Sequence, residues 1–136
     1  MLAFELPIRI YWEDTDAGGI VFYANYLKFF ERARTEWLRA LGIGQQALRE
    51  QSGGMFVVVN ANLTHHRSAR LDDELIVTAQ LQSSGRVALE LVQHAWLPQG
   101  QQRQLLCEAV IRIGWVDAVS MKPARIPPAI LEKFNS

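Results

Sequence analysis

The sequence predicts an α+β fold, because one strong helical pattern is followed by a series of strand patterns. A long amphipathic helix is expected at residues 25–41, after a short apolar segment at residues 8–12. Four segments rich in Val, Ile and Leu follow, with turn residues between them, at residues 55–64, 74–82, 87–97 and 103–116. The sequence therefore predicts five strands and one dominant helix.

The first strand is predicted from three alternating apolar residues, Ile8, Ile10 and Trp12. This strand leads into three acids and then breaks at a glycine pair; these residues are Glu13, Asp14, Asp16, Gly18 and Gly19. A helix begins after the glycines, with Asn25 as its expected N-cap. The order of these features places carboxylates close to the N-terminus of a helix.

The helix at residues 25–41 has an apolar arc that is wider than a single stripe. Helical spacing brings six residues to one side, namely Tyr26, Phe29, Phe30, Ala33, Trp37 and Leu41. Leu27 and Leu38 widen this side, as expected if a curved sheet wraps around the helix. Gly42 is expected to end the helix.

The remaining elements follow from turn residues and proline positions. A shorter helix is expected at residues 45–51, and residues 83–86 and 98–100 resemble hairpin turns. Three prolines, Pro123, Pro127 and Pro128, mark a tail before a final helical turn at residues 129–134.

Length and charge narrow the class of protein. A chain of 136 residues fits a single domain. Equal numbers of basic and acidic side chains, 14 of each, do not favour nucleic acid or a membrane surface as a partner.

The single cysteine, Cys107, lies in an apolar run and is interpreted as a core residue. Without a leader or transmembrane pattern, a cytoplasmic location is expected.

The acids beside a helix start suit acyl chemistry. The first turn of a helix has N–H groups without intrahelical partners and a partial positive charge, which can hold a carbonyl oxygen as it becomes an oxyanion. A nearby aspartate can attack the carbonyl carbon or activate a water. Gly18 and Gly19 permit positive φ and close approach of a ligand to the backbone.

Two segments carry a family resemblance: Asp14-Thr-Asp16-Ala-Gly-Gly-Ile-Val-Phe-Tyr23-Ala-Asn25-Tyr26 and Phe30-Glu-Arg-Ala-Arg34-Thr-Glu. They resemble the hotdog-fold acyl-CoA thioesterases, and among them the Tol-Pal-associated subfamily related to 4-hydroxybenzoyl-CoA thioesterase. Residues 69–74 and 121–127 are also similar to that subfamily. The resemblance implies one hotdog domain over residues 1–136, with a five-stranded antiparallel sheet wrapped around one long central helix.

The resemblance also implies an activity and roles for individual residues. Asp16 matches the family's catalytic aspartate, as nucleophile or general base, and the backbone N–H of Tyr23 matches the amide that polarises the carbonyl. The implied reaction is hydrolysis of an acyl-CoA, or of an acyl group on acyl carrier protein, without an organic or metal cofactor. Many members of the subfamily have histidine where this chain has Ala24, so the resemblance assigns no histidine to the site at this position.

Further candidates have both a structural and a functional interpretation. Asn25 is either a helix cap or a substrate contact, and Asp14 is assigned a structural hydrogen bond. Glu31 and Arg34 are spaced for an i,i+3 ion pair, although Glu31 is alternatively a residue that orients the active-site loop. His65 and His66 are adjacent in a predicted strand, so their side chains are expected to point to opposite faces of the sheet. His66 is kept as a pocket candidate.

Arginines are the natural candidates for binding the phosphates of CoA. Arg86, in a predicted turn, matches a position where related thioesterases place basic residues against the nucleotide, and weaker candidates are Arg67, Arg70 and Lys122. The resemblance further implies a homo-oligomer, a dimer or a tetramer, whose active site lies between subunits. Exposed sheet edges favour association on physical grounds too.

Two rival functions stay open from the sequence. A hotdog hydratase or dehydratase would need a histidine paired with an acid, and no histidine lies in the Asp16 loop or the long helix. The other rival is a non-catalytic acyl-binding or scaffold protein of the Tol-Pal envelope system. Under either function, envelope or phospholipid-synthesis proteins are candidate partners of this protein.

Overall fold

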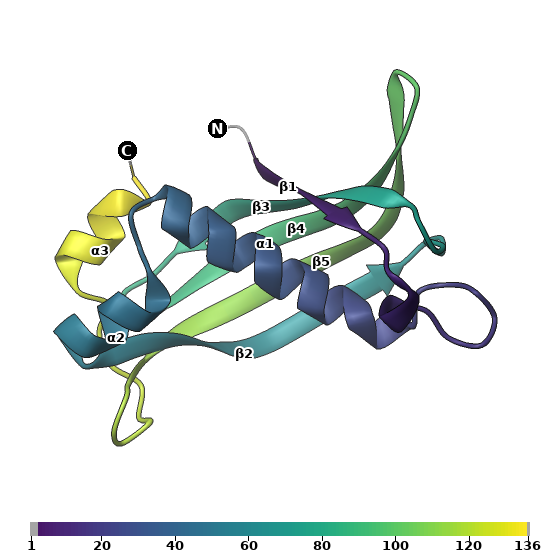
Figure 1. The fold of residues 1–136 in the computed structure, drawn as a ribbon. Coiled ribbons are helices and arrows are strands. Elements are labelled where there is room, and N and C mark those ends of the chain that lie inside the picture. The colour runs from purple at the N-terminus through teal and green to yellow at the C-terminus, as the bar shows by residue number, and fades with distance from the viewer. Residues whose placement is uncertain (1–2, 136) are drawn as a thin grey trace.

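The computed structural model describes residues 3–135, in which five strands form one antiparallel sheet with α1 lying across one face (Figure 1). The strands are β1 (Phe4–Arg9), β2 (Gly54–His65), β3 (Glu74–Ser84), β4 (Ala88–Gln99) and β5 (Gln102–Asp117). The helices are α1 (Tyr26–Ala40), α2 (Gln45–Ser52) and α3 (Pro128–Lys133). The predicted α+β architecture, with five strands and one long helix, is confirmed.

The strand order β1-β3-β4-β5-β2 leaves β1 and β2 at the two edges of the sheet. The hairpins β3-β4 and β4-β5 use the predicted turns, and Gly100 in the second turn has a φ of +64°. Along the β2–β5 pair, Gly54 faces Asp117 and His65 faces Cys107. The C-terminal end of β2 thereby reaches the end of the sheet where the loop before α1 lies (Figure 1).

The helix α1 contributes the centre of the hydrophobic core. Its buried side chains are Tyr26, Phe29, Phe30, Ala33, Trp37 and Leu38. Leu27, predicted to widen the buried arc, is instead exposed, because the sheet covers the helix from one side only. Gly42, with a φ of +84°, donates its N–H to the carbonyl of Arg39 and ends the helix as predicted.

The first strand ends earlier than the alternation predicts. Strand β1 stops at Arg9, and Ile10 exchanges backbone hydrogen bonds with Asp72 and Asp73, just before β3. The chain then enters a 3₁₀ turn at Trp12–Asp14, and the Trp12 side chain is 81% exposed. The predicted extension of the strand through Trp12 is therefore wrong, because the Asp72–Asp73 backbone turns the chain at Ile10.

Two further expectations from composition can be compared with the structure. Cys107 is fully buried, and burial raises the pKa of its thiol to about 12, as expected for a core residue. Within residues 3–135, none of the helices has the length and apolar character that crossing a bilayer requires.

Candidate active site

The candidate site is built on the loop between β1 and α1. This loop folds back on itself, because Thr15 and Val21 form an isolated antiparallel bridge and the N–H of Asp16 donates to the carbonyl of Ile20 at 2.9 Å. A second bridge joins Ile20 to Arg70, in the segment before β3. The loop is thus a small hairpin that is held at its base by backbone hydrogen bonds.

Asp14 lies at the base of this loop and is only 6% exposed. Its Oδ2 accepts the N–H of Tyr11 at 2.8 Å. Its backbone carbonyl accepts both the N–H of Phe22 at 3.1 Å and the side-chain amide of Asn25 at 2.8 Å. The structural role assigned to Asp14 agrees with these contacts.

Asp16 lies at the exposed tip of the same loop. Its Oδ1 accepts the N–H of Gly18 at 2.8 Å, and its carbonyl accepts the N–H of Gly19 at 3.0 Å. Gly19 has a φ of +78°, which an L side chain rarely adopts, so a glycine is favoured at this turn. A Cβ on Gly18 would lie 3.2 Å from the Asp16 Oδ1. The glycine pair therefore fixes where the carboxylate sits.

The helical backbone begins before the predicted cap. Phe22 has extended dihedral angles, and a 3₁₀ turn at Tyr23–Asn25 runs directly into α1. Asn25 directly precedes α1, at the position predicted for its cap, but it has helical dihedral angles and its side chain bonds to Asp14 and makes no capping hydrogen bond. Tyr23 is the first residue of the helical segment, where an N–H has no intrahelical acceptor.

Asp16 and Tyr23 border one pocket of about 250 Å³. The pocket lies between the loop, the start of α1 and the chain that leaves β2, and its lining residues are Asp16, Ile20, Val21, Tyr23, Tyr26, His65, His66, Arg67 and Ser68. Asp16 also borders a second hollow of about 410 Å³, lined by Trp12, Thr15, Asp16, Ala17, Gly19 and Leu71. Asp16 and the first residue of the helical segment thus border the same space.

His65 is the residue at this pocket that the sequence interpretation missed. Its ring packs edge-on against Tyr26, with ring centres 5.4 Å apart, and against Tyr23 at 5.9 Å. His66 turns toward β5, where its Nε2 lies 3.2 Å from Glu108 Oε1. The two rings point in different directions, as the strand alternation predicted, yet both border the pocket because β2 ends at His65.

The basic candidates are spread over the molecule. Arg67 borders the pocket with Asp16, and Arg70 donates its backbone N–H to Asp73 beside the loop. Arg86 follows the far end of β3, a strand that spans roughly 35 Å at about 3.3 Å per residue. The backbone of Lys122 bonds to Asp117 at that same far end. Within one chain, Arg86 and Lys122 are therefore not neighbours of Asp16.

The predicted Glu31–Arg34 ion pair is replaced by other contacts. Glu31 accepts the hydroxyl of Thr35 at 2.7 Å, and Arg34 donates to the side-chain oxygen of Gln93 at 3.0 Å. Thr35 lies one turn further along α1 and Gln93 lies on β4, so neither contact supports the idea that Glu31 orients the Asp16 loop. Among residues 3–135, no cluster of three His, Cys, Asp or Glu side chains is arranged to hold a metal ion.

Backbone N–H groups at a helix start can stabilise an oxyanion, and a carboxylate can act as a nucleophile or a general base, so a site with both groups suits acyl transfer. The family model of the thioesterase-like superfamily matches residues 10–134. The chain belongs to this superfamily.

A relative and two solved structures illustrate the superfamily relationship. The acyl-CoA thioesterase YbgC of Haemophilus influenzae is 39% identical over 132 residues, which cover 97% of this chain and 94% of that protein. A probable thioesterase from Bartonella henselae is 29% identical, with a TM-score of 0.82 over 93% of this chain and all of the other.

The second structure supports the hotdog fold. It is a 4-hydroxybenzoyl-CoA thioesterase mutant complexed with 4-hydroxybenzoyl-CoA, with a TM-score of 0.90. The alignment covers 96% of this chain and 97% of the other, at 19% identity, so this likeness bears on the fold alone. The predicted hotdog-fold thioesterase family is confirmed.

Proposed function

We propose that this protein hydrolyses acyl-CoA thioesters, or acyl groups on acyl carrier protein, to a free acid and a thiol. The observation that carries the proposal is the pocket shared by the Asp16 carboxylate and the start of the helical segment at Tyr23. The names of the superfamily and of the relative at 39% identity support the same reaction class.

In the first step, the thioester carbonyl oxygen accepts the backbone N–H of Tyr23. This N–H is the first of a helical segment that continues into the 15-residue α1, so the partial positive charge of the helix adds to the hydrogen bond. The carbonyl carbon becomes more electrophilic, and the developing oxyanion gains a donor that is already in place.

Asp16 then acts by one of two routes. As a nucleophile, its carboxylate oxygen bonds to the carbonyl carbon and the thiolate leaves, giving an anhydride that water hydrolyses to regenerate Asp16. As a general base, Asp16 takes a proton from water while the water oxygen bonds to the carbonyl carbon, and the thiolate then leaves with that proton. Because Oδ1 already accepts the Gly18 N–H, we assign the reacting role to Oδ2.

A second copy of the chain is part of the proposal. Asp16, Tyr23 and Trp12 are all exposed, so water would reach the reacting carbon from several sides in a single chain. A dimer or tetramer would cover this face and would bring a second copy's Arg86 toward the nucleotide of CoA. Arg86→Ala is then expected to raise KM for acyl-CoA and to leave an acyl-pantetheine substrate unchanged; equal loss for both substrates contradicts the role.

The cellular setting is proposed on resemblance alone. We propose one hotdog domain over residues 1–136, a cytoplasmic location, and envelope or phospholipid-synthesis proteins as partners. Binding of acyl-CoA without turnover would instead support the non-catalytic scaffold.

The test is thiol release from short, long and aromatic acyl-CoAs and from acyl carrier protein loaded with the same groups. The wild-type protein is expected to turn over at least one series, and Asp16→Asn to lose about 10²- to 10⁴-fold in kcat, the range typical of general acid–base groups. Absence of turnover by the wild type across both series would contradict the proposal.

A further inference from the structure

His65 lies on the side of the Asp16 pocket that the end of β2 supplies. It is the last residue of this edge strand, and it borders the pocket of about 250 Å³ together with Asp16 and Tyr23. The three residues come from three different segments of the chain. The pocket is thus bordered by an acid, by the first residue of a helical segment and by a histidine.

Two tyrosine rings hold the imidazole in place. The ring centre of His65 lies 5.4 Å from that of Tyr26 and 5.9 Å from that of Tyr23, both in edge-on arrangements. Tyr26 is only 2% exposed, and its hydroxyl accepts the N–H of Ala69 at 3.3 Å. The Tyr26 ring also packs edge-on against Phe29 in the core. His65, which is itself exposed, therefore rests against a side chain that is anchored in the core.

The ring nitrogens of His65 are not engaged by the protein. Within residues 3–135, no hydrogen bond or ion pair joins either nitrogen to another residue. The other two histidines differ, because both direct their Nε2 atoms at Glu108, His66 at 3.2 Å and His94 at 3.9 Å. Of the two histidines at the pocket, only His65 therefore has both nitrogens available to a bound molecule.

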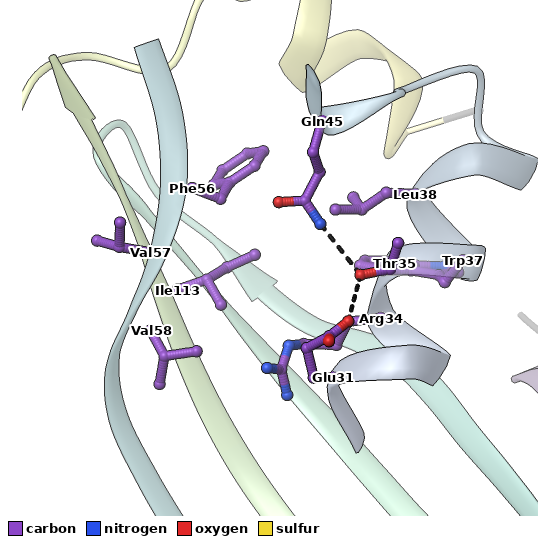
Figure 2. A pocket seen from close by; sticks show the side chains of 10 residues that line it. All are labelled: Glu31, Arg34, Thr35, Trp37, Leu38, Gln45, Phe56, Val57, Val58 and Ile113. Atoms are coloured by element: carbon purple, nitrogen blue, oxygen red, sulfur yellow. Dashed lines mark hydrogen bonds between the residues drawn. The ribbon is translucent and has the colours of Figure 1, made fainter. Parts of the chain in front are cut away.

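Polar side chains further along α1 are engaged with one another. Figure 2 shows the amide of Gln45 donating to the hydroxyl of Thr35, and this hydroxyl donating to Glu31. The distances of these two bonds are 3.2 and 2.7 Å. His65 differs from these residues, because its nitrogens can bond to a substrate without breaking a bond within the protein.

The proposed mechanism leaves one developing charge without a partner. The Tyr23 N–H serves the carbonyl oxygen, and Asp16 reacts with the carbon or with water, but the sulfur takes up the electron pair of the C–S bond. A thiolate that forms in a partly apolar pocket is costly unless a donor offsets its charge. An imidazole suits this task, since it carries an N–H donor in both its neutral and its charged form.

We propose that His65 is a further catalytic residue, whose ring N–H donates to the sulfur of the thioester as the C–S bond breaks. The inference rests on the proposed function. A thioester group is planar, so its oxygen, its sulfur and its acyl chain leave the carbonyl carbon in three directions. With the oxygen at Tyr23 and Asp16 facing the carbon, the sulfur lies toward the end of β2.

The reaction balances without a net proton from His65. In the nucleophilic route, the Asp16 oxygen bonds to the carbonyl carbon, and the electron pair of the C–S bond passes to the sulfur. Water then hydrolyses the anhydride, and a proton released in that step neutralises the thiolate. In the general-base route, the proton held by Asp16 passes to the thiolate. His65 ends each cycle in the protonation state in which it began.

The test compares three thioesters of the acyl group that the wild type hydrolyses fastest. CoA and pantetheine leave as basic alkyl thiolates, whereas 4-nitrothiophenol leaves as a weakly basic thiolate that needs little stabilisation. His65→Phe keeps an aromatic ring against Tyr23 and Tyr26 but removes both nitrogens. Its kcat/KM is expected to fall about tenfold to a hundredfold for the CoA and pantetheine esters, and less than about threefold for the nitrothiophenyl ester.

Three outcomes with His65→Phe overturn the inference. Equal loss for all three esters, or no loss for any, excludes a donor to the sulfur. Loss for the CoA ester alone places the imidazole against the nucleotide. Absence of wild-type turnover across the acyl panel is a separate result, because it contradicts the proposed function and this inference together, before any His65 variant is measured.

Amide variants separate a hydrogen-bond donor from an aromatic contact surface. His65→Asn and His65→Gln keep an N–H close to the positions of Nδ1 and Nε2, respectively, and lose the ring. With the CoA ester, the better of the two is expected to be more active than His65→Phe. Higher activity of His65→Phe than of both amides would mean that the acyl chain packs on the ring, which overturns the donor role.

His94→Phe is the matched control. His94 lies on β4 and does not border the Asp16 pocket, and its ring packs against Trp96 with ring centres 5.5 Å apart. This variant is expected to keep the wild-type kcat/KM for all three esters. Equal losses in His94→Phe and His65→Phe would contradict a specific role for His65.

Discussion

The base and the tip of the loop before α1 use the same side chain for opposite purposes. At the base, Asp14 is buried, and its carboxylate and carbonyl together accept three hydrogen bonds from Tyr11, Phe22 and Asn25. At the tip, Asp16 is exposed, and its carboxylate accepts one bond, from Gly18. Only Thr15 separates Asp14, which holds the fold, from Asp16, whose carboxylate can accept further hydrogen bonds.

This difference indicates that hydrogen bonds of the main chain position Asp16, the proposed reacting group. Hydrogen bonds of the main chain hold the loop: some are made by the backbone of Asp16, and others are accepted by the carbonyl of Asp14. None of these bonds involves the Asp16 carboxylate. Substitutions at the base should therefore lower stability first, whereas substitutions at the tip should lower turnover first.

The largest effect after Asp16 itself is expected from Gly18→Ala at the tip. The added Cβ lies 3.2 Å from Asp16 Oδ1, and the carboxylate must shift to relieve the contact. We expect kcat to fall by about tenfold to a hundredfold, because small misplacements of a reacting group are costly, while the melting temperature is kept. Gly44→Ala is the control, since no atom lies within 4 Å of its Cβ position. Unchanged kcat in Gly18→Ala would contradict positioning by the glycine pair.

At the base, Asp14→Ala is expected to lower the free energy of unfolding by about 1–3 kcal/mol, because the N–H of Tyr11 loses its acceptor in a partly buried place. Urea unfolding measures this loss. Glu13→Ala, at the exposed neighbour, serves as the control and should stay within about 0.5 kcal/mol of the wild type. Equal stability of the two variants would remove the distinction between base and tip.

A smaller loss, about 0.5–1.5 kcal/mol, is expected for Asn25→Ala, which removes the bond to the Asp14 carbonyl. Asn25→Asp separates this role from helix capping, because aspartate is a good N-cap but cannot donate to a carbonyl. Both variants should therefore unfold at lower urea than the wild type. If Asn25→Asp kept wild-type stability, capping would be the correct role after all.

The smallest effect is expected for Tyr23→Phe. The proposed polarising group is the backbone N–H, and the ring contacts to Phe22 and His65 do not need the hydroxyl. We expect kcat/KM within about twofold of the wild type, because the change keeps the ring and leaves the backbone N–H in place. A large loss would assign the chemistry to the phenol and not to the amide.

Much of the fold was predictable because it depends on local periodicity. The helix face from Tyr26 to Trp37, the stop at Gly42 and the turn at Gly100 follow from spacing and from backbone preference. The end of β1 at Arg9 was not predictable, since it depends on hydrogen bonds between Ile10 and the distant pair Asp72–Asp73. The pairing of β2 with β5 is likewise a long-range choice that no local pattern reveals.

The candidate site shows the same division. The Asp16 loop and the helix start at Tyr23 are continuous in sequence and could be recognised together. His65 reaches the pocket only through the register of β2 with β5, and no signal in its neighbourhood indicates this. Arg34 could not be separated from an ordinary ion pair, because its partner Gln93 lies on β4.

The central claim, that Asp16 reacts and Asp14 supports, is tested most directly by Asp16→Asn and Asp14→Asn measured side by side for thiol release and for urea unfolding. We expect Asp16→Asn to lose about 10²- to 10⁴-fold in kcat at wild-type stability, since the amide oxygen can still accept the Gly18 N–H. Asp14→Asn should keep measurable turnover and should lose less stability than Asp14→Ala, because its amide oxygen can still accept the Tyr11 N–H. Wild-type kcat in Asp16→Asn, or complete loss of turnover in a folded Asp14→Asn, would contradict the assignment of the two acids.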